Sequence, residues 1–231
     1  MPRRIPLLLP LLATVLFAAV PAVAQEARPL DPARVPATGA RVRDFVPGGW
    51  RVAQQVTGDL NGDGRDDRVL HVVPLSQTHY DPAAVVAGPE AHAIVVLLGE
   101  AGGRPRRGGV APRLLQLGMP QYGLEMSIRR GVLIVNQNYG MTRVADLTHR
   151  FRWDAATRRF LLIGRDEFLY TRPQGMDDHI RRSENYLTGV RLITTGFSEN
   201  GRIARESTRR ERIPRTRTPM ERVDELERWP S

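Results

Sequence analysis

The stretch that decides the fold is residues 50–73, WRVAQQVTGDLNGDGRDDRVLHVV. Its centre is rich in aspartate and glycine, and each flank has the composition of a β-strand. Before the centre, Trp50, Val52 and Val56 recur at a period of two, the spacing of one strand face. After it, residues 69–73 are rich in β-branched side chains. The stretch therefore predicts a strand, a polar loop and a second strand.

Strand patterns continue along the chain with short connections between them. Arg130 and Gly131 have the composition of a tight turn, and residues 154–157 that of a hairpin turn. No long amphipathic pattern separates the strands, so we expect an all-β domain of antiparallel sheets, arranged as a sandwich or a partial propeller. Besides the two strands above, we expect strands near 93–98, 113–117, 124–129, 132–137, 147–153, 159–163, 166–171 and 188–195.

The chain divides into four expected segments: a signal peptide at 1–24, a linker at 25–44, a β domain at 45–205 and a charged tail at 206–231. The linker is inferred from several prolines and little periodicity. In the tail, Thr218, Pro219 and Glu221 fit the N-cap, first position and capping box of a short C-terminal helix. The arginine-rich residues 202–217 fit either a solvated strand or a loose tail.

The N-terminus has the three parts of a cleavable signal peptide. Arg3 and Arg4 form a positive region, residues 7–20 are almost entirely apolar, and Ala22-Val23-Ala24 is a small-x-small cleavage site. The apolar run is shorter than the roughly 20 residues of a spanning helix. We therefore expect a periplasmic or secreted protein with no membrane span after cleavage.

The composition narrows the function classes. The chain has no cysteine, which excludes disulfides, thiolate metal sites and a lipoprotein anchor. Its net charge is +9, and every basic residue is arginine. The arginines are dispersed and no nucleic-acid motif is present, so we do not expect nucleic-acid binding. The positive surface suits either an anionic polymer of a bacterial envelope or plain solvation.

The polar loop has the donor pattern of a calcium site. Calcium takes six to eight oxygen ligands, which converge when a backbone coils around the ion. Gly64, at position 6, permits the sharp turn that such a coil needs. The alternative is an Asx-rich turn that binds no metal. The expected donors stand at loop positions 1, 3, 5, 7 and 9: the side chains of Asp59, Asn61 and Asp63, the backbone carbonyl of Arg65 and the side chain of Asp67.

Residues 58–73 resemble the calcium-binding blades of FG-GAP, integrin-like and VCBS repeat proteins. As in those blades, strands and not helices flank the loop. Position 12, which is a bidentate glutamate in an EF-hand loop, is Leu70 here and lies inside an apolar strand. The resemblance implies that the same five residues ligate Ca²⁺. A propeller repeats such blades, whereas this chain contains the motif once. More loosely, residues 47–50, 58–64 and 185–189 are similar to a group of uncharacterised exported bacterial proteins, and this similarity implies no activity.

These observations predict an exported calcium-binding β module with a structural or partner-binding role in the bacterial envelope. The partner expected is an anionic envelope polymer or another envelope protein. The alternative function is an envelope hydrolase acting on glycan or peptide, although no catalytic motif is present. Residues 176–179, Met-Asp-Asp-His, are interpreted as a polar loop and not as half of a metal or acid–base site.

Overall fold

The computed structural model describes residues 29–75, 92–115, 121–140, 143–171, 176–199 and 202–225, and the expected signal peptide at 1–24 lies outside these ranges. The all-β prediction is confirmed, because the strands form two antiparallel sheets and the helical elements are short 3-10 turns. The strands are β1 Trp50–Gly58, β2 Asp67–Pro74, β3 Ala93–Gly99, β4 Pro105–Ala111, β5 Gln121–Arg129, β6 Val132–Gly140, β7 Arg143–Asp154, β8 Arg159–Thr171, β9 Met176–Asn185, β10 Val190–Glu199 and β11 Arg202–Arg212.

The small sheet is a four-stranded meander in the order β1-β2-β3-β4. Its strand β3 is apolar throughout because both of its faces are covered. Ile94, Val96 and Leu98 face a core shared with the large sheet. Val95 and Leu97 face a second core on the opposite side. A continuous apolar run is the pattern expected of a strand buried on both faces.

The second core is closed by residues 29–49, most of which belong to the expected linker. This segment contains the 3-10 turns η1 (Pro32–Arg34) and η2 (Val42–Phe45), and it inserts the buried side chains of Leu30, Val35 and Phe45 against the small sheet. The segment therefore acts as a third layer. Its apolar residues are separated by prolines and turns, so they have no helical or strand period that would have predicted this packing.

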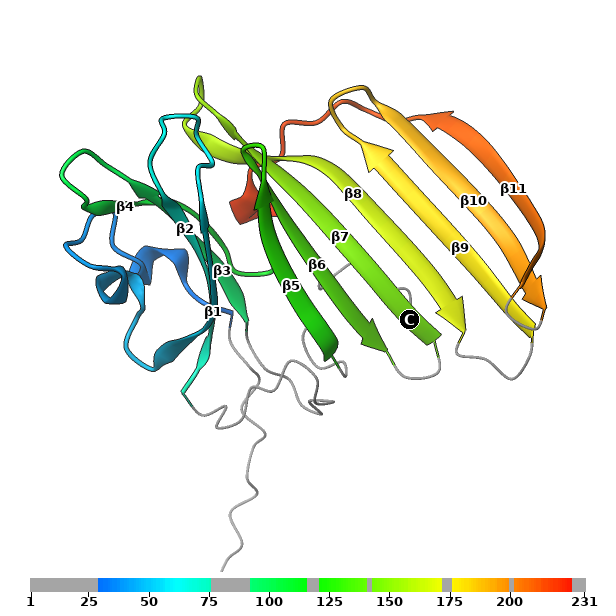
Figure 1. Cartoon of the computed structure of the whole chain (residues 1–231), viewed down its shortest axis with the longest axis horizontal. Coiled ribbons are helices and arrows are strands. Elements are labelled where there is room, and N and C mark those ends of the chain that lie inside the picture. Colours follow the sequence, from blue (N-terminus) through cyan, green and yellow to red (C-terminus); the bar gives the residue numbers. More distant parts are fainter. Residues whose placement is uncertain are drawn as a thin grey trace, which may run out of the picture.

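The large sheet is a meander of β5 to β11 in chain order (Figure 1). Strands β5–β8 pack on the small sheet through the shared core, while β9–β11 extend beyond it. The predicted turn at Arg130-Gly131 is confirmed, since both residues have positive φ, as a two-residue hairpin turn requires. The predicted hairpin around residues 154–157 is confirmed as well. The two strands expected at 159–163 and 166–171 form one strand, β8, interrupted by a bulge at Ile163.

Two strands were not expected. Residues 102–109 contain four glycines and three arginines, which predicts a loop, but this prediction is wrong because β4 begins at Pro105. Its glycines reflect close packing: a Cβ on Gly109 would lie 2.5 Å from the sulfur of Met220. The polar loop expected at 176–179 is also wrong, because it forms the start of β9. The strand expected at 113–117 lies partly outside the described residues, and residues 112–115 form bends.

The C-terminal segment returns from β11 along the large sheet toward β4 (Figure 1). The expected short helix is the single 3-10 turn η3 (Met220–Arg222), whose N-cap residue is Pro219 and not Thr218. The backbone N–H of Leu162 donates to the carbonyl of Thr218 at 2.9 Å, which ties the segment to β8. Since β11 runs to Arg212, the sheet continues past the boundary expected at residue 205.

Candidate functional site

The loop between β1 and β2 contains four of the five residues expected to bind calcium, and the fifth, Asp67, is the first residue of β2. The prediction of strands on both sides is confirmed. Within the loop, the side chains of Asp59, Asn61 and Asp63 each accept a hydrogen bond from the backbone N–H two residues further on, at 2.9–3.1 Å. These bonds make three consecutive Asx turns.

Asp59 is the centre of the loop's hydrogen bonds. Its two oxygens also accept from the N–H groups of Gly62 at 2.7 Å and Gly64 at 2.9 Å. Both glycines have positive φ, a conformation that other residues rarely adopt. The hydrogen bond from Gly64, followed by those from Gly62 and Asn61, lowers the pKa of Asp59 and keeps it ionised.

Asp63 has a cation beside it. One guanidinium nitrogen of Arg65 lies 2.8 Å from Asp63 Oδ2, and the side-chain amide of Asn61 donates to the same oxygen at 3.1 Å. Partial burial alone would raise the pKa of Asp63, but the N–H of Arg65 and these side-chain contacts lower it. A metal ion at Asp63 would therefore replace the guanidinium of Arg65.

Asp67 differs from the other carboxylates because it is fully buried. It accepts from the N–H of Leu60 at 2.8 Å and from the N–H of Gly99, at the end of β3, at 2.9 Å. Burial raises its pKa, the two hydrogen bonds oppose that rise, and the charges of Asp63 and Asp59 add to it. The three carboxylates thus lie close enough to repel one another. Asp67 also fastens the loop to β3.

The donor set fits a hard cation, since it consists of carboxylate, amide and carbonyl oxygens on one coil. No group of three or more histidine, cysteine, aspartate or glutamate side chains in the described ranges has a metal-holding geometry. The structure therefore does not bring Asp59, Asp63 and Asp67 together as a metal-binding group of three carboxylates. The oxygens of Asp67 face Leu60 and Gly99, and two of the five expected donors are an amide and a backbone carbonyl.

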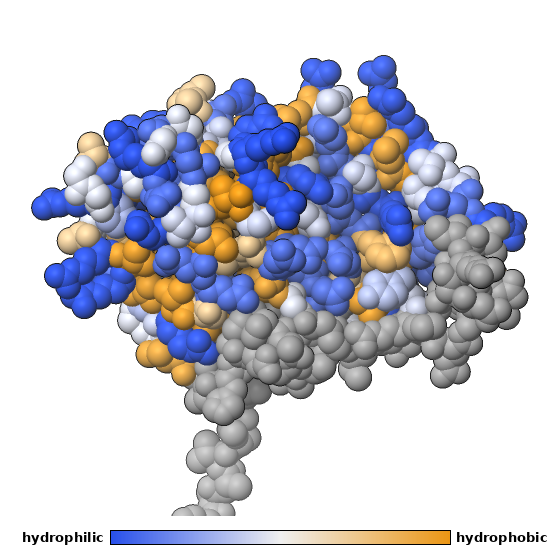
Figure 2. Space-filling model, in the orientation of Figure 1, coloured by the Kyte–Doolittle hydropathy of each residue, from blue (hydrophilic) through white to orange (hydrophobic). Residues whose placement is uncertain are grey.

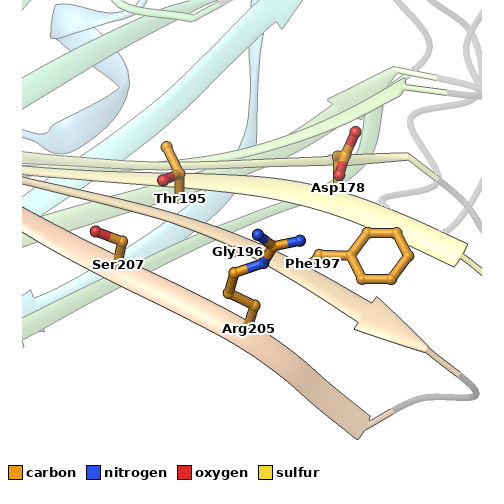
Figure 3. Close-up of a pocket in the computed structure, with 6 residues that line it drawn as sticks. All are labelled: Asp178, Thr195, Gly196, Phe197, Arg205 and Ser207. Atoms are coloured by element: carbon orange, nitrogen blue, oxygen red, sulfur yellow. The ribbon is translucent and has the colours of Figure 1, made fainter.

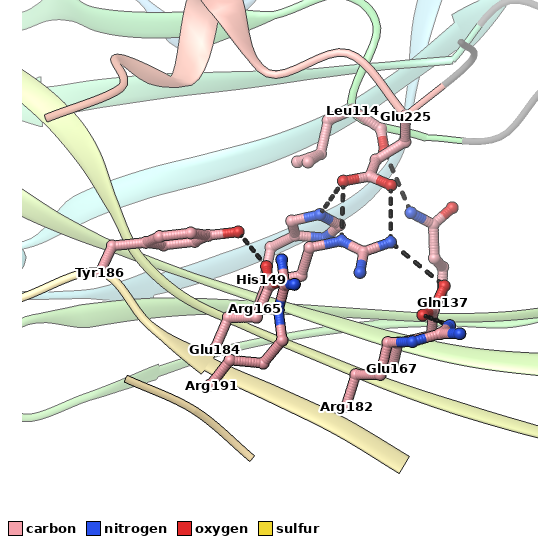
Figure 4. Close-up of polar contacts among 10 residues, drawn as sticks. All are labelled: Leu114, Gln137, His149, Arg165, Glu167, Arg182, Glu184, Tyr186, Arg191 and Glu225. Carbon is pink, nitrogen blue, oxygen red and sulfur yellow. Dashed lines mark hydrogen bonds and ion pairs between the residues drawn. The ribbon is translucent and has the colours of Figure 1, made fainter. Parts of the chain in front are cut away.

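A second polar cluster lies buried under the C-terminal segment (Figure 4). Glu225, which is 1% exposed, contacts His149 Nε2 at 2.8 Å and accepts two hydrogen bonds from Arg165, each at 3.0 Å. His149 and Arg165 are cross-strand partners in β7 and β8, so they face the same side of the sheet. Burial would raise the pKa of Glu225, but His149 and Arg165 lower it to about 2.

The cluster continues across the sheet as alternating charges. Arg182 donates to Glu167 at 2.6 Å, and Arg191 donates to Glu184 at 2.7 Å. The hydroxyl of Tyr186 donates to the other oxygen of Glu184. Sequence reasoning did not find this cluster, because Glu225 is separated along the chain by 60 residues from Arg165 and by 76 residues from His149. Each of its carboxylates is in an ion pair, which is the arrangement of a structural network.

A buried histidine pair lies in and beside the small sheet. His71 Nε2 and His92 Nδ1 are 2.9 Å apart and both residues are almost fully buried. Burial lowers the pKa of His92 to about 4 and also lowers the pKa of His71. Both rings are therefore neutral near pH 7, as expected of histidines that belong to a core.

Open pockets occur along the outer strands of the large sheet. Two neighbouring pockets of about 340 and 250 Å³ share Thr195 and Ser207 on β10 and β11. Figure 3 shows the first, which Phe197, Arg205 and Asp178 also line. His179, next to Asp178 in β9, points to the opposite face, where it packs under Gly196. Asp178 and His179 therefore do not form a joint site.

On the face shown in Figure 2, polar residues predominate and hydrophobic residues are interspersed among them. In the described part of the chain, no helix has the length and apolar character needed to span a bilayer. Comparisons of the chain with protein-family models, with curated proteins and with solved structures found no match.

Proposed function

We propose that this chain is an exported β module whose residues 59–67 bind one calcium ion. The observation that supports this most is the series of Asx turns at Asp59, Asn61 and Asp63. The turns occur at loop positions 1, 3 and 5, and Gly64 has the positive φ needed at position 6. Arg65 supplies its carbonyl and Asp67 completes the ligands directly or through water.

The ion's role in this proposal is structural. Leu60 lies in the core shared by the two sheets, and a Cβ on Gly58 would be 3.2 Å from Ile128 of β5. Asp67 ties the same loop to β3. The loop is therefore at the junction of the sheets. A cation there offsets the repulsion among three carboxylates and fixes the junction in a chain that has no disulfide.

In this proposal a partner-binding role in a bacterial envelope is favoured over the hydrolase alternative, because no catalytic motif is present and carboxylates of β7 and β8 have partners. Three carboxylates on the strands β7 and β8 have hydrogen-bonding partners. Asp166 pairs with Arg150, and Glu167 pairs with Arg182. Asp146 accepts from Asn136 at 2.6 Å. The envelope polymer and the envelope protein are both retained as partners in this proposal.

Thermal unfolding of the chain from Gln25 tests the calcium assignment. Binding at 100 times the dissociation constant stabilises a protein by about 2.7 kcal/mol. With a dissociation constant on the order of 10⁻⁵ M, the melting temperature should therefore rise by several degrees between EDTA and ~1 mM CaCl₂. Asp63→Ala should abolish the rise. Asp66→Ala is the matched control, because Asp66 is exposed and outside the ligand set.

The proposal fails if the unsubstituted chain melts at the same temperature in EDTA and in calcium. It also fails if Asp63→Ala keeps the full calcium response. Magnesium provides a further arm: a coiled loop of many oxygens suits the larger ion, so an equal concentration of Mg²⁺ should give the smaller rise.

A further inference from the structure

Strand β11 forms the outer edge of the large sheet (Figure 1). From Arg205 to Arg212 it pairs with β10 without a bulge. The chain that follows turns back across the sheet, where the N–H of Ile213 donates to the carbonyl of Gly189, between β9 and β10, at 3.0 Å. In the described part of the chain, no strand pairs with the other side of β11. A row of backbone donors and acceptors therefore faces outward along this edge.

The other edges of the two sheets are protected by their structure. The N–H of Arg107 in β4 donates to the carbonyl of Ala37, so residues 29–49 cover that edge. Strand β1 has a bulge between Val52 and Gln54, and β1 and β5 contact each other. Bulges and covering segments prevent an edge from pairing with another chain. On β11 the charged side chains take that place, so their arrangement decides what the edge can pair with.

The charges of β11 are arranged so that the strand is complementary to itself. When two copies of a strand pair antiparallel around a two-fold axis, residues at equal distances on either side of the axis stand opposite each other. With the axis at Thr208, Glu206 lies opposite Arg210. In the same register Arg205 lies opposite Glu211. The two-fold axis repeats both pairs, and pairs of opposite charge stabilise neighbouring strands.

No other register in the regular part of β11 fits as well. Every other axis position from 205 to 211 places an arginine opposite an arginine or a glutamate opposite a glutamate. An axis at Ser207, for example, places Arg205 opposite Arg209. Like charges that stand directly opposite each other destabilise a strand pair. The charges therefore specify one register and disfavour the rest.

The side chains of this register are accessible to a second copy. Arg205 and Arg210 are exposed, and neither forms an ion pair within the described residues. Glu206 is 37% exposed and lies 3.6 Å from His179. Glu211 is 35% exposed, and its two ion-pair distances within the chain are 3.2 and 3.6 Å. Each carboxylate can therefore accept a further guanidinium group.

We propose that β11 pairs with β11 of a second copy of this chain, antiparallel and with the two-fold axis at Thr208, so that the two large sheets form one continuous sheet. The contact between two strand edges is smaller than the roughly 1,000 Å² of a stable interface, so we expect a dissociation constant on the order of 10⁻⁵ to 10⁻⁴ M. None of the proposed calcium ligands lies on β11. The inference does not depend on the calcium ion, and its experiments are done in EDTA.

Sedimentation equilibrium of the chain from Gln25 tests the association. Between ~1 µM and ~1 mM protein, the average mass should rise from that of one chain toward that of two. Added salt should lower it at a given concentration, because exposed charge pairs are screened. A chain that stays monomeric up to ~1 mM would overturn the proposal. A mass that rises past two chains would also overturn it, since a two-fold contact closes on itself.

Charge reversal tests the register. Glu206→Arg and Arg210→Glu should each raise the dissociation constant about tenfold or more, because both symmetry-related attractions become repulsions. An equimolar mixture of the two variants should associate again, since opposite charges face each other in the mixed pair. Thermal unfolding of each variant alone shows that it is folded. A mixture of folded variants that stays monomeric would contradict the proposed register.

Arg209→Glu is the matched control for Arg210→Glu. Both variants change the net charge by the same amount, but Arg209 lies opposite the uncharged Ser207 in this register. We therefore expect Arg209→Glu to change the dissociation constant by no more than about threefold. If it weakened association as strongly as Arg210→Glu, net charge and not the register would govern the contact, which would overturn the proposal.

Discussion

The small sheet and the outer strands of the large sheet are stabilised in different ways. In the small sheet, β3 has a core on each face, and almost every side chain of β2 and β3 is buried. In β9–β11, exposed and buried residues are mixed, and neighbouring strands are joined by polar pairs such as Thr194 with Thr208 and Arg191 with Glu211. A cross-strand pair of this kind contributes roughly 0.2–1 kcal/mol. A buried large side chain contributes several times more.

From this difference in packing we infer that one region provides most of the stability and the other provides a binding surface. The small sheet and β5–β8 share one apolar core, while the pockets along β9–β11 lie on strands that depend little on that core. Substitutions in the first region should therefore change the free energy of unfolding. Substitutions in the second should change mainly what the surface binds.

The largest expected effect is that of Phe45→Ala. Phe45 is the largest buried side chain of residues 29–49, the segment that closes the second core. We expect the free energy of unfolding to fall by about 4 kcal/mol, measured with urea, because the cavity left behind adds to the lost burial. Leu192→Ala on β10, where the leucine is 41% exposed, should cost less than about 0.5 kcal/mol. Equal losses would show that residues 29–49 are not part of the core.

The next largest effect on the free energy of unfolding should be that of Glu225→Gln. The substitution removes the carboxylate that contacts His149 and Arg165 and leaves Arg165 its 3.3 Å ion pair with Glu167, and breaking such a buried pair costs about 3 kcal/mol. Glu206→Gln is the control, because Glu206 is 37% exposed and lies 3.6 Å from His179. Urea unfolding of both variants measures the difference. Similar stabilities of the two would mean that the C-terminal segment is not held by Glu225.

The histidine pair of the small sheet and the Glu225 cluster on β7 and β8 should lose stability in different pH windows. The folded pKa of His92, about 4, is below the ordinary 6.5, so its contribution is present above pH 6.5 and is lost as the pH falls to 4. The folded pKa of Glu225, about 2, is below the ordinary 4.5, so its contribution is lost between pH 4.5 and 2. Each loss is roughly 3 kcal/mol.

Unfolding free energies at a series of pH values distinguish the windows. A His71→Gln, His92→Asn double variant should flatten the dependence between pH 6.5 and 4 and leave the lower window unchanged. Glu225→Gln should do the reverse. If both variants flattened the same window, the histidine pair and the Glu225 cluster would not titrate independently.

Gly109→Ala should have the smallest of these effects. The added methyl group would meet the sulfur of Met220 at 2.5 Å, and the crowding should cost about 1–3 kcal/mol. Gly48→Ala is the matched control, since nothing lies within 4 Å of its added Cβ. Thermal unfolding of the pair tests whether β4 needs glycine for packing. A neutral Gly109→Ala would mean that it does not.

The sequence predicted the features that depend on neighbouring residues. The strands around residues 59–67, the Arg130-Gly131 turn and the hairpin at 154–157 all follow from short patterns, and the structure confirms them. The loop's Asx turns occur where the spacing of aspartate and asparagine places them. The metal ion itself stays a prediction.

The features that sequence reasoning missed depend on residues far apart in the chain. Gly109 looks like part of a flexible loop until Met220 is known to pack on it. Phe45 has no periodic neighbours, and its burial is decided by the small sheet. Glu225 gains its role only from β7 and β8. In each case the tertiary partner overrides the local pattern.

The structure of crystals grown in calcium chloride tests most directly the central claim that residues 59–67 bind calcium. Our account predicts a strong electron-density peak within about 2.3–2.6 Å of oxygens from Asp59, Asn61, Asp63 and Arg65, with the guanidinium of Arg65 displaced from Asp63. A loop with the same Asx turns, no ion and Arg65 still on Asp63 would contradict it.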